Sequence, residues 1–187
     1  EARIAADICE HTLRGKAVAE AAGRYEALPA SDLFDMEYWS LEQAKLGKQA
    51  EKPLARQVVL VTGGAGAIGV GIGEACADAG AHVVLADIDG ARAHHAASAL
   101  EKRHGAGRAL GLEVDVCSES SLRAAFDSVC LAYGGIDVVV PNAGIALVSA
   151  IESLTAADVR RVSDVNYLGV LLSIREAARI FRAQGTG

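Results

Sequence analysis

The stretch that decides the fold is Thr62-Gly63-Gly64-Ala65-Gly66-Ala67-Ile68-Gly69, which follows an apolar run at 57–61 and opens a helical stretch of small residues. A strand, a glycine-rich turn and a helix N-terminus in this order direct backbone N–H groups and the positive end of the helix dipole at one point, where a pyrophosphate can sit. Gly64, Gly66 and Gly69 have the spacing of a dinucleotide-binding turn. Such turns also occur as plain packing turns, so the glycines alone leave both interpretations open.

An acidic residue after the next apolar run favours a nucleotide. The run 81–86 ends in Asp87, eighteen residues beyond Gly69. A carboxylate at this distance can accept hydrogen bonds from the adenosine ribose, and it would repel a 2′-phosphate. The glycine turn has no Lys or Arg, and Ile88 follows the acid. We therefore predict NAD rather than NADP; the alternative is that Asp87, or Asp89, only caps the next helix.

Composition excludes several classes of function. The 187 residues are 51% hydrophobic with a mean hydropathy of +0.25, enough to bury a core. A net charge of −6 and a pI near 5.4, without a basic cluster, argue against nucleic acid and anionic membranes as partners. No apolar stretch approaches the roughly 20 residues that span a bilayer. The cysteines (Cys9, Cys76, Cys117 and Cys130) lack C-x-x-C or zinc spacing, so we expect reduced, mostly buried thiols in a cytoplasmic protein without a metal site.

The order of the elements predicts an α/β fold with a doubly wound, Rossmann-like parallel sheet. Apolar runs predict strands at 57–61, 81–86, 108–114 and 136–140. The segments between and after them predict helices at 67–79, 90–103 and 118–133 and helical segments over 155–183. Repeated βα units with right-handed crossovers give the strand order 3-2-1-4, with a cleft at the carboxyl ends of strands 1 and 4.

The first 50 residues have a different character. They predict an alanine-rich helix over 1–28 and a second helix over 33–46, with residues 29–32 offering its N-cap. The polar stretch 47–53 marks a boundary between a helical extension, 1–53, and the sheet domain, 54–187.

Further polar residues follow the third and fourth strands. Asp115-Val116 could accept a hydrogen bond from an adenine amino group, or Asp115 could cap the helix that starts near Ser118. Asn142-Ala143-Gly144 suits both a cofactor lining and a strand-to-strand connection. Asn166 lies inside the last helical region, where it predicts a local kink or a water site, although a solvated side chain is the simpler alternative.

Taken together, these motifs resemble the N-terminal half of a classical short-chain dehydrogenase/reductase over residues 54–187. The resemblance implies that Gly63, Gly64, Gly66, Ala67, Ile68 and Gly69 hold the pyrophosphate and that Asp87 binds the ribose. It implies that Asp115 and Val116 flank adenine, that Asn142, Ala143 and Gly144 line the path to the nicotinamide, and that Asn166 holds a water in a proton relay.

The chain departs from the family pattern at two positions and in one larger respect. Ala67 replaces the middle glycine of the turn, and Pro141 replaces an Asn before Asn142. The family's Ser and Tyr-x-x-x-Lys would fall beyond Gly187, so we expect this chain to be an inactive part of a longer protein. Its open sheet edge and uncovered last helix predict poor solubility.

The segment 33–46 further resembles the linker of bifunctional rhamnulose-1-phosphate aldolase/short-chain dehydrogenase proteins. That resemblance implies an upstream aldolase, oxidation of lactaldehyde with NAD in rhamnose catabolism, and a homo-oligomeric parent. Two alternatives stay open: a non-catalytic nucleotide-binding or scaffold module, and an extended-type sugar-nucleotide epimerase or reductase, which the reading T-G-x-x-G-x-x-G at 62–69 would suit.

Overall fold

The computed structural model describes residues 2–37 and 51–185, and it divides the chain into two compact units, 1–51 and 52–187. The first unit holds α1 (Ala2–Ala22) and α2 (Ala30–Glu37). The second helix begins three residues earlier than predicted, at Ala30, and the N–H of Leu33 donates to the carbonyl of Pro29 over 3.1 Å. Residues 38–46 of the predicted second helix lie outside the described residues.

The second unit confirms the predicted α/β fold. Its four strands are β1 (Val58–Thr62), β2 (His82–Asp87), β3 (Ala109–Glu113) and β4 (Val138–Val140). They form one parallel sheet in the order β3-β2-β1-β4, with Val59 opposite both Val83 and Val138. This is the order expected from right-handed crossovers.

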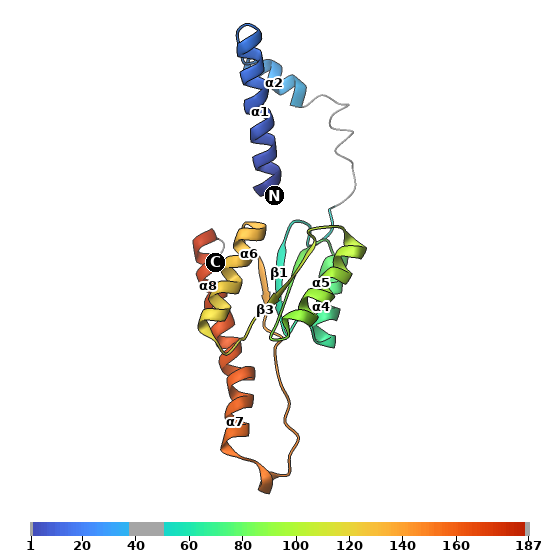
Figure 1. Cartoon of the computed structure of the whole chain (residues 1–187), viewed down its shortest axis with the longest axis vertical. Helices are drawn as coiled ribbons and strands as arrows, with labels where there is room; N and C mark the ends of the chain where they lie inside the picture. Colours follow the sequence, from blue (N-terminus) through green and yellow to red (C-terminus); the bar gives the residue numbers. More distant parts are fainter. Residues whose placement is uncertain (1, 38–50, 186–187) are drawn as a thin grey trace. The chain divides into compact units, whose positions relative to one another are not determined.

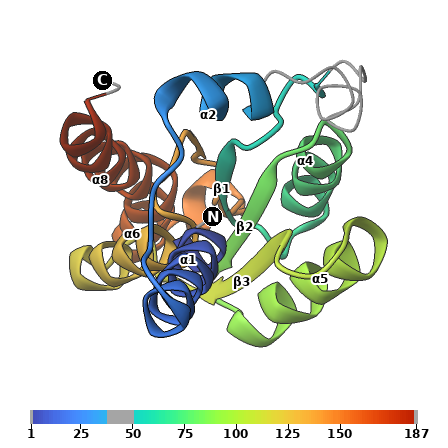
Figure 2. The same ribbon diagram turned by 90° about the horizontal axis from the view of Figure 1, so that it is seen from above.

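Helices cover both faces of the sheet (Figures 1 and 2). One side carries α4 (Ala67–Asp78) and α5 (Gly90–His104), and the other carries α6 (Glu119–Tyr133) and α8 (Gly169–Gln184). The last helical region is not continuous: η1 (Ile151–Ser153), α7 (Ala156–Ser163) and the π-helical turn η2 (Asp164–Leu168) precede α8.

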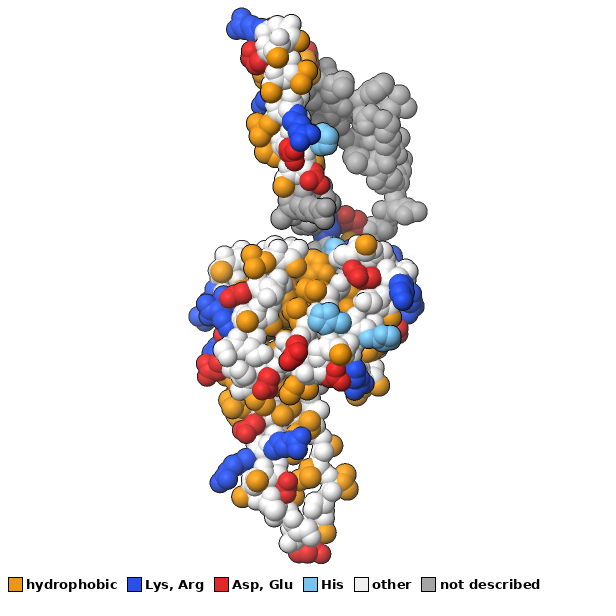
Figure 3. Space-filling view, in the orientation of Figure 1, with side chains coloured by type: hydrophobic (Ala, Val, Ile, Leu, Met, Phe, Trp, Pro, Cys, Tyr) orange, Lys and Arg blue, Asp and Glu red, His pale blue; other side chains and the backbone are white. Residues whose placement is uncertain are grey.

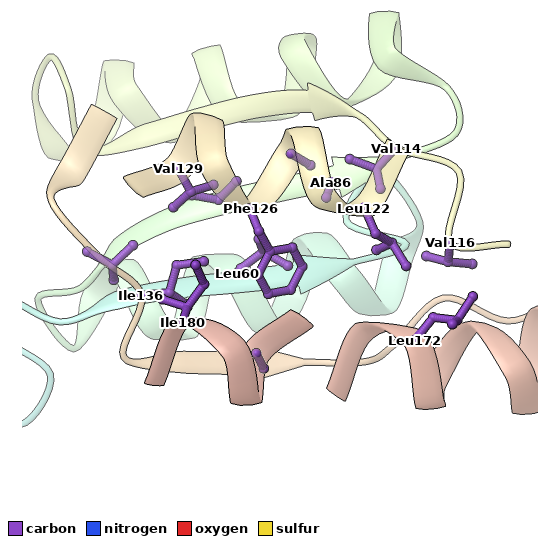
Figure 4. Packing of buried hydrophobic residues seen from close by; sticks show 14 residues of the cluster. Leu60, Ala86, Val114, Val116, Leu122, Phe126, Val129, Ile136, Leu172 and Ile180 are labelled. Carbon is purple, nitrogen blue, oxygen red and sulfur yellow. The ribbon is translucent and has the colours of Figure 1, made fainter. Parts of the chain in front are cut away.

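The alternation of side chains along β1 produces two separate cores. Val59 and Val61 point to the α4–α5 side, whereas Val58 and Leu60 point to the α6–α8 side. Figure 4 shows Phe126 of α6 lying against Leu60 on the latter face. Full burial of each such side chain contributes about 1.5–3 kcal/mol to the stability of the fold. The packing on both faces therefore stabilises the sheet.

Polar contacts fix α8 against its neighbours. The side-chain amide of Gln184 pairs with the backbone of Ile136, accepting from its N–H and donating to its carbonyl, each over 2.9 Å. On the same helix, buried Glu176 accepts a 2.8 Å hydrogen bond from Nε of Arg179, which also contacts Asp127 of α6 over 2.6 Å. These contacts tie α8 to β4 and α6.

The segment from the end of β4 to the start of α8 packs much less closely. Neither η1, α7 nor η2 has a buried residue. In Figure 3, hydrophobic side chains lie open on the arm that α7 and the preceding loop form. The large exposed ones on this segment and the first turns of α8 are Leu147, Val148, Ile151, Leu154, Val159, Tyr167, Leu168, Leu171 and Ile174. Exposed apolar groups in such numbers favour association.

Two further features bear on the predictions from composition. None of the described helices is long and apolar enough to cross a membrane. The expectation of mostly buried cysteines is wrong: Cys9 is exposed, and Cys76, Cys117 and Cys130 are half-buried. Burial raises the pKa of these last three thiols, so they stay protonated at neutral pH.

Candidate nucleotide-binding site

A cleft of about 700 Å³ lies at the carboxyl ends of the strands in the second unit. Six residues that the sequence predicts for a nucleotide site line it: Gly63, Asp87, Asp115, Val116, Ala143 and Gly144. The other wall comes from η2 and α7, including Arg160, Arg161 and Asp164, which the sequence did not indicate. The topology therefore gathers side chains from four separate loops at one edge of the sheet.

The glycines of the turn have different tasks. A Cβ on Gly64 would lie 2.7 Å from Cα of Leu85, and one on Gly69 would strike the carbonyl oxygen of Gly63. These two glycines are buried and serve close packing. A Cβ on Gly66 would meet only the carbonyl oxygen of Gly63, at 3.3 Å, and Ala67 is exposed. The turn thus leaves room for a ligand at Gly66, and the alanine that replaces a glycine at position 67 fits.

Gly63 is the one residue of the turn with a left-handed backbone, at a φ of 62°. A Cβ there would also lie 2.8 Å from Cα of Ala143. Backbone conformation and close approach both require glycine at this position. Gly63 therefore holds the glycine turn directly against the segment after β4.

The N-terminus of α4 differs from those of the other helices around the cleft. Side chains cap α5, α6 and α7: Asp89 accepts from the N–H of Arg92, Ser118 from that of Ser121, and Thr155 from that of Asp158. The N-cap of α4 is Gly66, which has no side chain to offer. The first N–H groups of α4 are thus left for an anion, and a dinucleotide pyrophosphate fits this cradle.

Asp87 stands beside this helix N-terminus. Its Oδ2 accepts from the N–H of Ala65 and its Oδ1 from that of Asp89, each over 3.0 Å. The helix cap belongs to Asp89, so the alternative in which Asp87 only caps α5 does not hold. Ile68 and Ile88 flank this end of the turn with 73% and 71% of their surfaces exposed. The arrangement joins an oriented carboxylate to two apolar contact surfaces.

Asp115 and Val116 occupy the corresponding place after β3. Asp115 accepts from the N–H of Cys117 over 2.9 Å, while Ser118 caps α6. Val116 lies against Gly169, where a Cβ would come within 2.8 Å of its Cγ2. Burial, together with the neighbouring Asp115 carboxylate, raises the pKa of the Cys117 thiol, and both residues line the cleft.

Asn142 connects β4 to β1 and does not line the cleft. Its Nδ2 donates to the carbonyls of Thr62 and Gly63 over 3.0 and 3.2 Å. In the other direction, the buried hydroxyl oxygen of Thr62 accepts from the N–H groups of Asn142 and Ala143, both over 3.1 Å. No sequence motif gave Thr62 a role beyond opening the glycine turn; its hydroxyl at the end of an otherwise apolar strand was the available signal.

Asn166 lies at the centre of the π-helical turn η2, a local irregularity in the last helical region. Its amide pairs with the backbone of Ile145, accepting from the N–H over 2.8 Å and donating to the carbonyl over 2.9 Å. The side chain is exposed and does not line the cleft. It holds the loop after β4 against the helical region. Within the described residues, no group of three or more His, Cys, Asp or Glu side chains could hold a metal ion.

Both parts of the chain match known protein families. Residues 57–187 match the short chain dehydrogenase family, and residues 1–46 match the second domain of class II aldolases. The uncharacterized oxidoreductase YuxG of Bacillus subtilis is 36% identical over 170 residues, which are 90% of this chain and 25% of that protein. The chain therefore spans about a quarter of the length of this curated relative.

Two solved structures show the same fold. A short-chain type dehydrogenase/reductase from Mycobacterium marinum aligns with a TM-score of 0.69 and 32% identity, covering 73% of this chain and 55% of that one. A 3-ketoacyl-(acyl-carrier-protein) reductase from Brucella melitensis complexed with NADH aligns with a TM-score of 0.65 and 30% identity, covering 70% and 52%. The chain thus spans about half the length of these structures.

Proposed function

The chain belongs to the short-chain dehydrogenase family, whose members use NAD(P), and we propose that it is the NAD-binding part of an oxidoreductase. One observation carries the proposal: the α4 N-terminus without a side-chain cap lies beside the oriented carboxylate of Asp87. An anion cradle next to a ribose acceptor is the combination that a dinucleotide requires.

Each part of the proposed binding site then has a task. Gly63, Gly66, Ala67 and Ile68 surround the pyrophosphate, with Gly64 and Gly69 packed behind them, and Asp87 accepts from the ribose hydroxyls. Asp115 and Val116 hold the adenine, and Ala143 and Gly144 line the path toward the nicotinamide. Asn142 supports that path from behind. When bound, the nicotinamide supplies hydride transfer to or from the substrate.

The proton-transfer machinery is a separate matter. No Tyr-x-x-x-Lys sequence occurs in the 187 residues. The Asn166 amide accepts from the N–H of Ile145 and donates to its carbonyl, so we assign it the positioning of the loop after β4. We therefore propose that this chain binds NAD but does not turn over substrate by itself.

For the longer protein we propose oxidation of a small hydroxyaldehyde or alcohol, with lactaldehyde in rhamnose catabolism as the first candidate. The aldolase match over 1–46 supports this choice, because a class II aldolase acting on a sugar phosphate would supply such an aldehyde to a dehydrogenase on the same chain. We further propose a cytoplasmic homo-oligomer that acts on a small molecule, without nucleic acid or membrane as partner.

Calorimetric titration of the chain with NAD and with NADP tests the proposal. We expect binding with a clear preference for NAD. If the folded protein binds neither dinucleotide, the glycine turn serves only for packing, and the alternative function of a scaffold module is favoured. Lactaldehyde oxidation by the longer protein tests the substrate; NAD binding by that protein without turnover would reject lactaldehyde.

A further inference from the structure

The α7 side of the cleft carries two adjacent arginines. Arg160 and Arg161 stand in the last turn of α7, and both line the cleft together with Gly63 and Asp87. Both arginines are exposed, and α7 has no buried residue. Their side chains therefore take no part in a core, and they face the same space as the first glycine of the turn.

Neither guanidinium forms an ion pair with a carboxylate in the described part of the chain. Arg160 has no side-chain hydrogen bond or ion pair there, although Asp164 lies four residues away, a spacing at which helical ion pairs form. The pKa of Asp158 is lowered mainly by hydrogen bonds from Thr155, and the charge of Arg161 adds a smaller contribution. The donors of both arginines are therefore available to a ligand.

Arginines elsewhere in the second unit are paired. Arg103 of α5 pairs with Glu74 over 2.9 Å. Arg175 of α8 pairs with Glu119 over the same distance. The two arginines of α7 differ from these, because they face a cleft and have no carboxylate within ion-pair distance among the described residues.

The charges that line the cleft make these arginines necessary for an anionic ligand. Three carboxylates line it, those of Asp87, Asp115 and Asp164, and Arg160 and Arg161 are the basic residues among the lining residues. A dinucleotide has a negative charge on each phosphate of its pyrophosphate. The N-terminus of α4 supplies only about half an elementary positive charge. The arginines can offset the remaining repulsion between the phosphates and the carboxylates.

We propose that Arg160 and Arg161 form an outer phosphate contact, in which α7 binds the dinucleotide pyrophosphate from the side opposite the glycine turn. This inference rests on the proposed function and deepens it. The glycine turn supplies backbone N–H groups on one side, and the guanidinium groups supply positive charge on the other. A guanidinium suits this task because its planar set of donors can bind two phosphate oxygens at once.

Calorimetric titration with NAD, at low and at high ionic strength, tests the inference in a set of variants. Arg160→Gln and Arg161→Gln, alone and together, remove the positive charges, whereas Arg160→Lys combined with Arg161→Lys keeps them. Arg182→Gln is the matched control, because Arg182 is an exposed arginine of α8 that does not line the cleft. It changes the net charge as much as each single variant does. Thermal unfolding of each variant checks that the fold is intact.

At low ionic strength we expect the double Gln variant to bind NAD on the order of tenfold more weakly than wild type, and each single variant to lose less. Salt screens such contacts, so the difference should shrink at high ionic strength. The double Lys variant should recover most of the loss, and Arg182→Gln should change the affinity little.

Unchanged NAD affinity in the double Gln variant would overturn the inference and leave the proposed function in place. The same holds for a loss that the Lys variant does not restore, that salt does not diminish, or that Arg182→Gln reproduces. Folded wild-type chain that binds no NAD would overturn the proposed function itself, and this inference with it.

Discussion

The two walls of the cleft use their polar side chains differently. On the β2 wall, formed by the glycine turn and Asp87, the carboxylate contacts the backbone with part of its hydrogen-bonding capacity. On the β4 wall, formed by Ala143, Gly144 and Ile145, the amides of Asn142 and Asn166 do not line the cleft and donate to backbone carbonyls. The difference separates side chains that can serve a ligand from side chains that brace the walls.

The comparison predicts separable effects: variants of the β2 wall should change ligand affinity, and variants of the β4 wall should change stability. Gly63, which touches both walls, should show the largest effect. In Gly63→Ala the new Cβ would lie 2.8 Å from Cα of Ala143, in a backbone with a φ of 62°. We expect a loss of about 2–5 kcal/mol in the free energy of unfolding, from left-handed strain and overpacking together.

Urea denaturation measures that loss. Gly71→Ala is the matched control, because its Cβ would meet nothing within 4 Å. This helical alanine should stabilise the protein by up to about 1 kcal/mol. Equal denaturation midpoints for Gly63→Ala and wild type would show that the two walls do not depend on Gly63.

Asp87→Ala should act on affinity. Hydrogen bonds to a charged group contribute about 1.5–3 kcal/mol, so we expect NAD binding to weaken roughly 10- to 150-fold. Asp89→Ala serves as control: it removes the cap of α5 and should lower stability by about 0.5–2 kcal/mol, with little change in calorimetric NAD affinity. Unchanged NAD affinity in Asp87→Ala would remove this carboxylate from the site.

Asn142→Ala should act on stability instead. The carbonyls of Thr62 and Gly63 would each lose a donor, at a cost of about 1–3 kcal/mol to the free energy of unfolding. We expect NAD affinity to fall much less than in Asp87→Ala. A variant of normal stability that fails to bind NAD would contradict the assignment of Asn142 to the bracing side chains.

A smaller effect is expected at Asn166, which is exposed. Asn166→Asp keeps an acceptor for the N–H of Ile145 but loses the donor to its carbonyl. We expect the free energy of unfolding of Asn166→Asp to fall by about 1 kcal/mol. Asn166→Ala should in addition accelerate amide hydrogen exchange at Ile145, as NMR can measure. Unaltered protection of that amide would mean that Asn166 does not hold the loop.

The smallest effect is expected in the pH dependence of stability, through an ion pair between α6 and α8. A hydrogen bond from Arg179 lowers the pKa of Asp127, with a smaller contribution from Arg123. A carboxyl whose pKa is lower in the folded than in the unfolded state stabilises the fold above its unfolded pKa. That contribution is lost as the pH falls from about 4 through the lowered value. Denaturation midpoints measured across this range should fall less in Asp127→Asn than in wild type, and parallel pH profiles would contradict the pairing.

The sequence predicted the parts of the molecule that depend on neighbours along the chain. The apolar run before Gly63, the glycine spacing and the acid at Asp87 are local signals, and the strand order follows from crossover handedness. The bracing contacts are different, because Thr62 meets Asn142 across 80 residues and Gln184 meets Ile136 across 48. No pattern along the chain records such pairs.

Two further outcomes depend on side-chain reach. Arg92 is an ordinary helix residue by position, and only the fold brings its guanidinium to Ala65. The competing cap interpretations for Asp87 and Asp115 could be separated only by the observed partners, since Asp89 and Ser118 are equally good N-cap residues by type. In both cases the sequence gave the residue type, but only the structure showed which groups each side chain contacts.

The π-helical turn sets the rotational phase between the two helices that it joins. One extra residue in a helical turn rotates the next helix by roughly 100° about the helix axis. With this turn, Leu172 and Ile180 face the sheet while Arg160 and Arg161 face the cleft. Deleting a single residue from η2 would leave α8 seated by its apolar side chains and turn α7 away. The number of residues in η2 therefore determines which side chains line the cleft, as much as the identity of those side chains does.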